Sequence, residues 1–235
     1  FRMHQIIQLI DLNDPGPIST EQDKITICLI GFCCDEGIIR NLGRPGAKDG
    51  PEYIRREFAN LPVRYPLKLS IFDAGNIICQ GDDLEAYLSD LAKAVENILQ
   101  RNMFPVVLGG GHEIALGNYS GISQFLSYKM DKTDLGIINF DAHFDLRPYE
   151  NQASSGNMFS RISDMCVEQK KSFNYLCLGI QTSANTNSLF KKAQKLGVRY
   201  ILAKDFKKEN FTDISDTIRK FTEEHSHLHV TICTD

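Results

Sequence analysis

The stretch Phe-Pro-Val-Val-Leu-Gly-Gly-Gly-His-Glu at residues 104–113 is decisive for the fold, because an apolar strand passes through three glycines into a helical pattern. The same alternation of strand and helix recurs along the chain. Apolar, β-branched runs predict strands at 25–32, 69–73, 104–108, 135–140, 173–180, 198–202 and 228–233, and helical patterns lie at 51–60, 82–101, 113–127, 187–196 and 211–224. This order is typical of a parallel sheet with helices on both faces. We therefore expect an α/β protein with three α/β/α layers around a central, mainly parallel sheet.

The composition indicates one folded domain and a small-molecule partner. Of the 235 residues, 42% are hydrophobic and 24% are charged, which allows a sizeable core. The net charge is −4, the pI is about 5.9 and the basic residues are scattered, so neither nucleic acid nor a membrane is an expected partner. No linker, repeat or low-complexity tract divides the chain. We expect a single domain over residues 1–235.

The cysteines indicate a reducing compartment. They contain no Cys-x-x-Cys pair, and several lie inside apolar, strand-like runs, so we expect buried thiols and a cytoplasmic protein. The neighbours Cys33 and Cys34 could be reactive, or they could simply mark the end of a strand. The seven positions are Cys28, Cys33, Cys34, Cys79, Cys166, Cys177 and Cys233.

Three possible metal ligands stand two residues apart in Ile-Ile-Asn-Phe-Asp-Ala-His-Phe-Asp-Leu-Arg at 137–147. If the chain is still extended there, the side chains of Asp141, His143 and Asp145 point the same way. A lone Asp-x-His would more simply be explained by hydrogen bonding within a loop. Burying Asp141 and Asp145 at the end of an apolar strand without a cation would, however, cost several kcal/mol, which favours a metal site.

Two further candidate ligands also follow strands. His112 comes after the strand at 104–108, and Asp235 closes the strand-like run at 228–235. Ligands of parallel α/β sheets bind outside the carboxyl ends of the strands, so the agreement of three strand ends supports one site. A turn is the structural alternative for the glycines before His112, and their spacing does not fit a dinucleotide-binding loop.

The donor types favour a hard or borderline divalent cation. Carboxylates and imidazoles without thiolates suit Mn²⁺ first, with Zn²⁺, Fe²⁺ or Co²⁺ less favoured. Three carboxylates and two imidazoles are sufficient for two ions, which together would acidify a water molecule and thereby catalyse hydrolysis. The alternation of His225, His227 and His229 is a rival ligand set. We expect it instead at the solvated start of a strand, at the end opposite to the other ligands.

At this point the chain resembles the ureohydrolases, a family that includes arginase, agmatinase and formimidoylglutamase. The resemblance covers about residues 25–235. It rests on Gly-Gly-Gly-His at 109–112, Asp-Ala-His-Phe-Asp at 141–145, a Thr-Asp ending at 235 and the loop at 35–51. It implies an arginase-like fold and two Mn²⁺ ions per subunit. It also implies that the chain stops within the third metal-binding motif, whose next Asp would be residue 237.

The resemblance also implies a set of ligands and their roles. One ion would be held by His112, Asp141, Asp145 and Asp235. Asp141, His143 and Asp235 would take part in holding the other, with Asp141 and Asp235 bridging. Asp145 would orient the attacking water and move its proton, so Asp145 and His143 are the expected catalytic residues.

Within the family, the Gly-Gly-Gly-His-Glu form and the segment Ser-Ser-Gly-Asn-Met-Phe at 154–159 are similar to formimidoylglutamase. Arginases carry a His where this chain has Phe159. Arg147, and Arg44 from the first loop, are suited to grip a substrate carboxylate, which argues against agmatine. The resemblance therefore implies hydrolysis of N-formimidoyl-L-glutamate.

Each proposed substrate contact has a structural alternative. Arg147 could form a salt bridge to Glu150, Arg44 could pin a glycine-rich turn, and the polar group Ser155, Gly156 and Asn157 could be an ordinary turn. Two other functions also remain open. They are another ureohydrolase activity, on a guanidino acid or an agmatine-like amine, and a catalytically inactive scaffold of the same fold. A homo-oligomer is expected in each case.

Overall fold

The computed structural model describes residues 1–14, 24–64, 69–129 and 134–234. The chain forms two compact units, Phe1–Phe125 and Leu126–Asp235, and each is described by itself. The expectation of a single domain therefore stays a prediction. None of the described helices combines the length and the apolar character that crossing a membrane would require.

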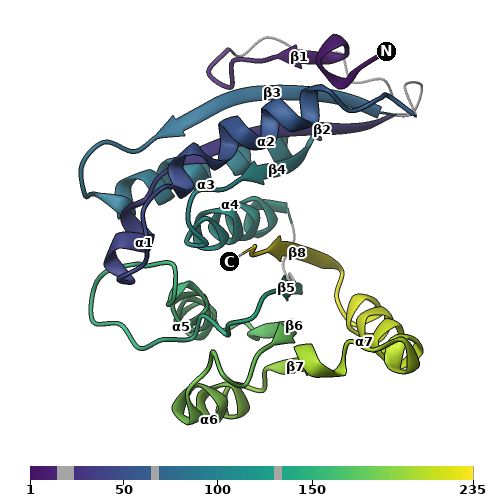
Figure 1. Cartoon of the computed structure of the whole chain (residues 1–235). Coiled ribbons are helices and arrows are strands. Elements are labelled where there is room, and N and C mark those ends of the chain that lie inside the picture. The colour runs from purple at the N-terminus through teal and green to yellow at the C-terminus, as the bar shows by residue number, and fades with distance from the viewer. Residues whose placement is uncertain (15–23, 65–68, 130–133, 235) are drawn as a thin grey trace. The chain divides into compact units, whose positions relative to one another are not determined.

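The first unit contains a four-stranded parallel sheet in the order β1-β3-β2-β4 (Figure 1). Its strands are β1 (Ile7–Leu9), β2 (Ile25–Cys33), β3 (Leu69–Ile78) and β4 (Phe104–Leu108). The helices that begin in this unit are α1 (Glu36–Arg40), α2 (Gly50–Ala59), α3 (Leu84–Gln100) and α4 (Ile114–Lys129), with 3₁₀ turns η1 (Met3–Gln5) and η2 (Ala47–Asp49). The predicted strands at 25–32 and 104–108 and the helix at 82–101 are confirmed within two residues.

α3 forms where the sequence predicts it, because its start is capped and one face is apolar. The Asp83 carboxylate accepts a hydrogen bond of 3.1 Å from the Ala86 amide, which satisfies one of the first amides of the helix. The apolar face is buried against the unit's core. Its buried residues are Leu84, Leu88, Leu91, Ala92, Val95 and Ile98.

β3 begins at its predicted start and runs five residues beyond its predicted end, to Ile78. Asp73 lies inside it, 9% exposed, and is compensated by two bonds from the Arg55 guanidinium, of 2.7 and 2.8 Å. The same guanidinium donates to the Gly75 carbonyl at 2.8 Å. A polar residue can therefore lie within this strand because α2 supplies its partner.

The second unit contains another four-stranded parallel sheet, in the order β7-β6-β5-β8 (Figure 1). Its strands are β5 (Leu135–Phe140), β6 (Asn174–Ile180), β7 (Arg199–Leu202) and β8 (His227–Ile232). The helices are α5 (Met158–Glu168), α6 (Asn187–Lys195) and α7 (Phe211–Glu223), with 3₁₀ turns η3 (Ala203–Asp205) and η4 (Lys208–Asn210). Five of the six residues of β5 are buried, so β5 lies in the middle of its unit.

The α/β class and the parallel strand pairing are confirmed, and the strands are distributed over two sheets. Besides the 3₁₀ turns, three described elements were not predicted: β1, α1 and α5. β1 has three residues and α1 has five, which is too short for a periodic pattern to stand out. α5 buries Met158, Phe159, Ile162 and Cys166, a helical spacing that directly follows the proposed substrate contacts Ser155, Gly156 and Asn157.

Candidate metal centre

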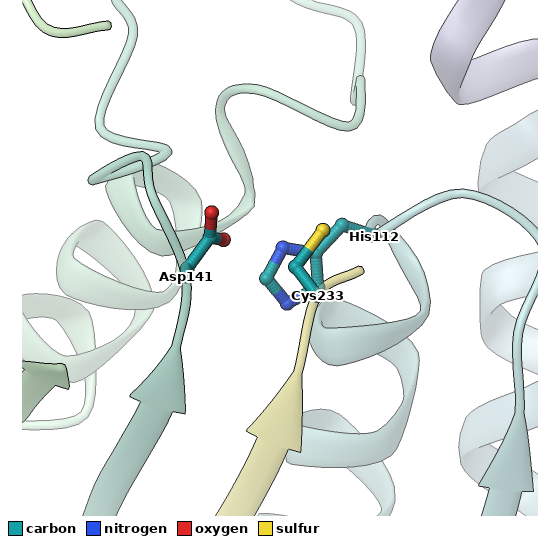
Figure 2. Close-up of side chains that lie close together, drawn as sticks. All are labelled: His112, Asp141 and Cys233. Atoms are coloured by element: carbon teal, nitrogen blue, oxygen red, sulfur yellow. The ribbon is translucent and has the colours of Figure 1, made fainter. Parts of the chain in front are cut away.

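Asp141 and Cys233 extend from neighbouring strand ends of the second unit. β5 pairs with β8 up to Phe140 and Ile232, and the Cys233 amide then donates to the Phe140 carbonyl at 2.9 Å. The side chains of Asp141 and Cys233 follow these two strands, as Figure 2 shows. A carboxylate oxygen of Asp141 and the Sγ of Cys233 lie within 4.8 Å of each other. The expectation that the cysteines are buried is wrong for Cys33, Cys79 and Cys233, which are partly exposed, and Cys233 lies beside this carboxylate.

The segment from Asp141 to Asp145 is not an extended comb, so that expectation is wrong. β5 ends at Phe140, and the chain bends at residues 142 and 143. The bend forms because the Asp141 carboxylate accepts a hydrogen bond of 2.8 Å from the His143 amide, as in an Asx turn. Asp145 has φ of +49°, in the left-handed region that Asp tolerates better than most residues. The turn nevertheless keeps two candidate ligands adjacent, with His143 Nδ1 3.5 Å from Asp141 Oδ1.

A buried polar network lies beneath this segment, and sequence reasoning missed it. Asn139, on β5, is fully buried, and its Nδ2 donates to Asp141 Oδ2 at 3.2 Å and to the Tyr175 hydroxyl at 2.9 Å. The Tyr175 hydroxyl in turn donates to the Phe144 carbonyl at 3.3 Å. Burial raises the pKa of Tyr175, so its hydroxyl stays protonated and can donate. A polar Asn inside the apolar run Ile-Ile-Asn-Phe was the available signal.

His112, in the first unit, lies in a loop after β4, as predicted. The Gly110 amide donates to the Phe32 carbonyl at 3.0 Å, and a Cβ on Gly110 would lie 2.6 Å from that oxygen. Gly110 is therefore needed for the close approach of the two backbone segments. The His112 carbonyl accepts from the Ala115 amide at 3.0 Å, so His112, 8% exposed, leads directly into α4.

Glu113 is an unexpected buried acid beside this histidine. Its side chain is 0% exposed, and neither carboxyl oxygen has a hydrogen-bond partner among the residues that the structure describes. Burial raises the pKa of Glu113 to about 8. The carboxyl group packs so closely against Gly37 and Gly111 that a Cβ on either would lie 2.2 Å or less from a Glu113 atom. A side chain at either position would therefore displace the Glu113 carboxyl group.

Comparison with known proteins assigns the family. The model of the arginase family matches residues 25–235. The chain belongs to the arginase family. It is 46% identical to the formimidoylglutamase of Clostridium tetani over 236 residues, which cover 100% of this chain and 70% of that relative. It is 40% identical to the formimidoylglutamase of Ralstonia nicotianae, with 100% of this chain and 69% of the relative covered.

Solved structures of the arginase family have the same fold. The formimidoylglutamase of Bacillus subtilis has a TM-score of 0.78 at 20% identity, over 99% of this chain and 69% of that one. A Trypanosoma cruzi formiminoglutamase solved with Mn²⁺ has a TM-score of 0.70 at 25% identity, over 86% of this chain and 68% of that one. The arginase-like architecture expected from the motifs is confirmed.

Two further sets of candidate metal ligands were Asp235 and the histidines at 225, 227 and 229. Asp235 lies outside the described residues. His227 pairs with Leu135, at the start of β5, so the histidine run lies at the strand end opposite to Asp141, as expected. The expectation that this strand start is solvated is wrong for His229, which is 2% exposed, and for His225, whose ring packs 4.3 Å from that of Phe221.

The role of Arg147, one of the proposed substrate contacts, stays a prediction. Its side chain is exposed, and it makes no ion pair with Glu150 in the described part of the chain. Its amide donates to the Gly156 carbonyl at 3.0 Å, which fixes the backbone while leaving the guanidinium available. Ser155 is partly exposed in the same turn.

For Asn157 the structure favours an ordinary turn. Its Oδ1 accepts from the Ser154 amide at 3.0 Å and its Nδ2 donates to the Gln152 carbonyl at 3.1 Å, so the whole carboxamide is engaged locally. The first-unit loop is pinned by Asp35, whose Oδ1 accepts from the amides of Gly46 and Lys48 at 3.0 and 2.9 Å. Arg44 is exposed and is not the residue that holds this loop.

Proposed function

We propose that this chain is a metal-dependent hydrolase that cleaves N-formimidoyl-L-glutamate to L-glutamate and formamide. The observation that carries the proposal is the 46% identity to a formimidoylglutamase over the whole chain. Further relatives of the same name are 40–43% identical over 100% of the chain. Arg147 adds a physical reason, because an exposed guanidinium is suited to a substrate that carries two carboxylates.

The donor groups of the second unit fit a hard divalent cation. Asp141 is 5% exposed, and its carboxylate accepts hydrogen bonds from the His143 amide and from Asn139. We propose Mn²⁺, and two ions per subunit, because a similar formiminoglutamase was solved with Mn²⁺. By their places in the motifs, we assign His112, Asp141, His143, Asp145 and Asp235 as ligands. When bound, the ions supply Lewis acidity that polarises the amidine and lowers the pKa of a water molecule.

The protein side chains then bind the substrate and move the proton. Arg147, with Arg44 as a second candidate, holds a glutamate carboxylate and so places the formimidoyl carbon. Water adds to that carbon, and the bond to the glutamate nitrogen breaks. Asp145 accepts the proton of the water and returns it to the leaving nitrogen, so that one water is consumed and formamide and glutamate leave. His143, beside Asp141, helps to hold the reacting groups in place.

The substrate class is tested with the full-length protein and a variant of Arg147. Wild-type protein should release formamide from N-formimidoyl-L-glutamate and should not turn over agmatine. Arg147→Gln should raise KM about tenfold or more, because a charge-assisted contact of about 1.5–3 kcal/mol is lost. Arg161→Gln is the matched control, since the Arg161 guanidinium packs over the Tyr149 ring at 4.9 Å and donates to the Asn151 carbonyl.

Turnover of agmatine in place of the amidino acid would overturn this assignment and favour another ureohydrolase activity. An unchanged KM in Arg147→Gln would remove Arg147 from the substrate site. We also propose a cytoplasmic homo-oligomer. Fractionation and light scattering on the purified protein test these two expectations.

A further inference from the structure

We infer that Asn185 is a positioning residue that holds the Asp141–Asp145 segment in its metal-binding shape. The inference rests on the proposed function, because it assigns that segment to the metal site. Asn185 lies in the loop between β6 and α6 and is 7% exposed. No motif of the sequence pointed to it.

The Asn185 carboxamide makes three hydrogen bonds, two of them to the candidate metal segment. Its Oδ1 accepts from the Phe144 amide at 3.0 Å. Its Nδ2 donates to the carbonyls of Ala142 and Gln181, both at 2.8 Å. Both amide hydrogens and the oxygen are therefore used, which is the condition for burying such a group without a large penalty.

The hydrogen bonds of Asn185 continue the backbone hydrogen-bond ladder between β5 and β6 beyond the ends of these strands. Beyond the paired strands, the Asp141 amide donates to the Leu178 carbonyl at 2.9 Å and the Gln181 amide donates to the Ala142 carbonyl at 3.0 Å. There β6 ends at Ile180, and the Phe144 amide donates instead to the Asn185 side chain. The Asn185 carboxamide, which carries the donor and acceptor of a peptide group, takes the place of the next backbone unit.

Phe144, whose amide donates to Asn185, lies between the candidate ligands His143 and Asp145. Its ring is 0% exposed and meets the rings of Phe190 and Tyr200 edge-on, with centroids 5.1 Å apart in each case. With its ring held by packing and its amide held by Asn185, Phe144 can move little. His143 and Asp145 are its immediate neighbours, so their positions are fixed by the same contacts.

The side chain of Asn185 also explains why a chain with a bend at 142–143 holds a defined shape. A bend at the surface would leave the Phe144 amide and the Ala142 carbonyl to water. Here a buried side chain 41 to 43 residues away satisfies both. The geometry therefore points to a segment that is formed before any metal binds, which lowers the entropy lost on binding.

The test compares Asn185→Asp and Asn185→Ala with wild-type full-length protein. Asn185→Asp keeps the size of the side chain and the oxygen that accepts from the Phe144 amide. It replaces the Nδ2 group by a second oxygen, which would face the carbonyl oxygens of Ala142 and Gln181. The matched control is Asn174→Ala, at the other end of β6, whose Nδ2 donates to Asp134 Oδ1 at 2.8 Å. Three quantities are measured: the Mn²⁺ dissociation constant by electron paramagnetic resonance, kcat and KM separately, and hydrogen exchange of the Phe144 amide in metal-free protein.

Both Asn185 variants should weaken Mn²⁺ binding about 10- to 100-fold, the usual effect of losing a group that orients metal ligands. They should lower kcat more than they raise KM, and the Asn174→Ala control should keep wild-type Mn²⁺ affinity. Exchange of the Phe144 amide should be slow in the wild type and faster in both variants. Wild-type Mn²⁺ affinity in Asn185→Asp, or a Phe144 amide that exchanges as fast as exposed loop amides in wild-type protein, would overturn the inference.

The two proposals can fail separately. Wild-type protein that binds Mn²⁺ but releases no formamide would refute the proposed function, while the affinities and exchange rates would still decide the role of Asn185. If an Asn185 variant does not fold, the exchange rate of the wild-type Phe144 amide decides the matter without any variant.

Discussion

Replacing Phe144 by Ala tests whether packing alone holds the candidate metal segment. The side chain is fully buried, and removal of a buried Phe costs about 3–5 kcal/mol of unfolding free energy. Part of this loss is the pair of edge-to-face ring contacts with Phe190 and Tyr200, at about 0.5–1.5 kcal/mol each. Phe144→Leu keeps most of the volume and should lose only the aromatic part, about 1–3 kcal/mol.

The assay is urea unfolding of metal-free protein, followed by Mn²⁺ titration under conditions in which each variant is still folded. Phe221→Ala is the control, because it removes a comparably buried ring that packs against His225 and not against Phe144. It should destabilise the protein by a similar amount and leave Mn²⁺ affinity near that of the wild type. A loss below about 1 kcal/mol in Phe144→Ala, with Mn²⁺ affinity unchanged, would refute the reasoning.

Two further predictions concern buried side chains, one in each unit. Tyr175→Phe should lower the unfolding free energy by about 1–3 kcal/mol in urea, because the hydroxyl joins Asn139 to the Phe144 carbonyl in the core; an unchanged midpoint would contradict the network. Burial raises the pKa of Cys28 from 9.0 to about 12, so the folded protein holds the thiol proton more tightly than the unfolded chain does. The resulting contribution to the unfolding free energy is fully present below pH 9 and is lost as pH rises through 12. Cys28→Ala should therefore gain stability relative to the wild type between pH 9 and pH 12, measured as the difference in urea midpoints, and a constant difference would refute the shift.

The strands and the candidate ligands could be predicted because each depends on local sequence. Apolar, β-branched runs gave β4 and β5 with their observed bounds, and the ligands follow from where those strands end. The helix α5 was not predicted, because the Gly156-Asn157 segment immediately before it is the more conspicuous feature of the local sequence. Its apolar residues do recur at helical spacing.

The shape of the metal segment could not be predicted, because it depends on contacts between residues far apart in sequence. Asn139 meets Tyr175 across 36 residues, and Asn185 meets Phe144 across 41. Nothing in the local sequence distinguishes Asn185 from an ordinary loop residue. The bend at residues 142 and 143 likewise arises from one hydrogen bond to Asp141, which competes with the extended backbone that alternation implied.

The most direct test is metal analysis of the full-length protein combined with an assay of formamide release from N-formimidoyl-L-glutamate. The account predicts two Mn²⁺ ions per subunit and the release of one formamide for each glutamate formed, with both lost when chelator removes the metal and restored by Mn²⁺. Protein that binds no metal and releases no formamide would contradict the central claim that this chain is a metal-dependent hydrolase.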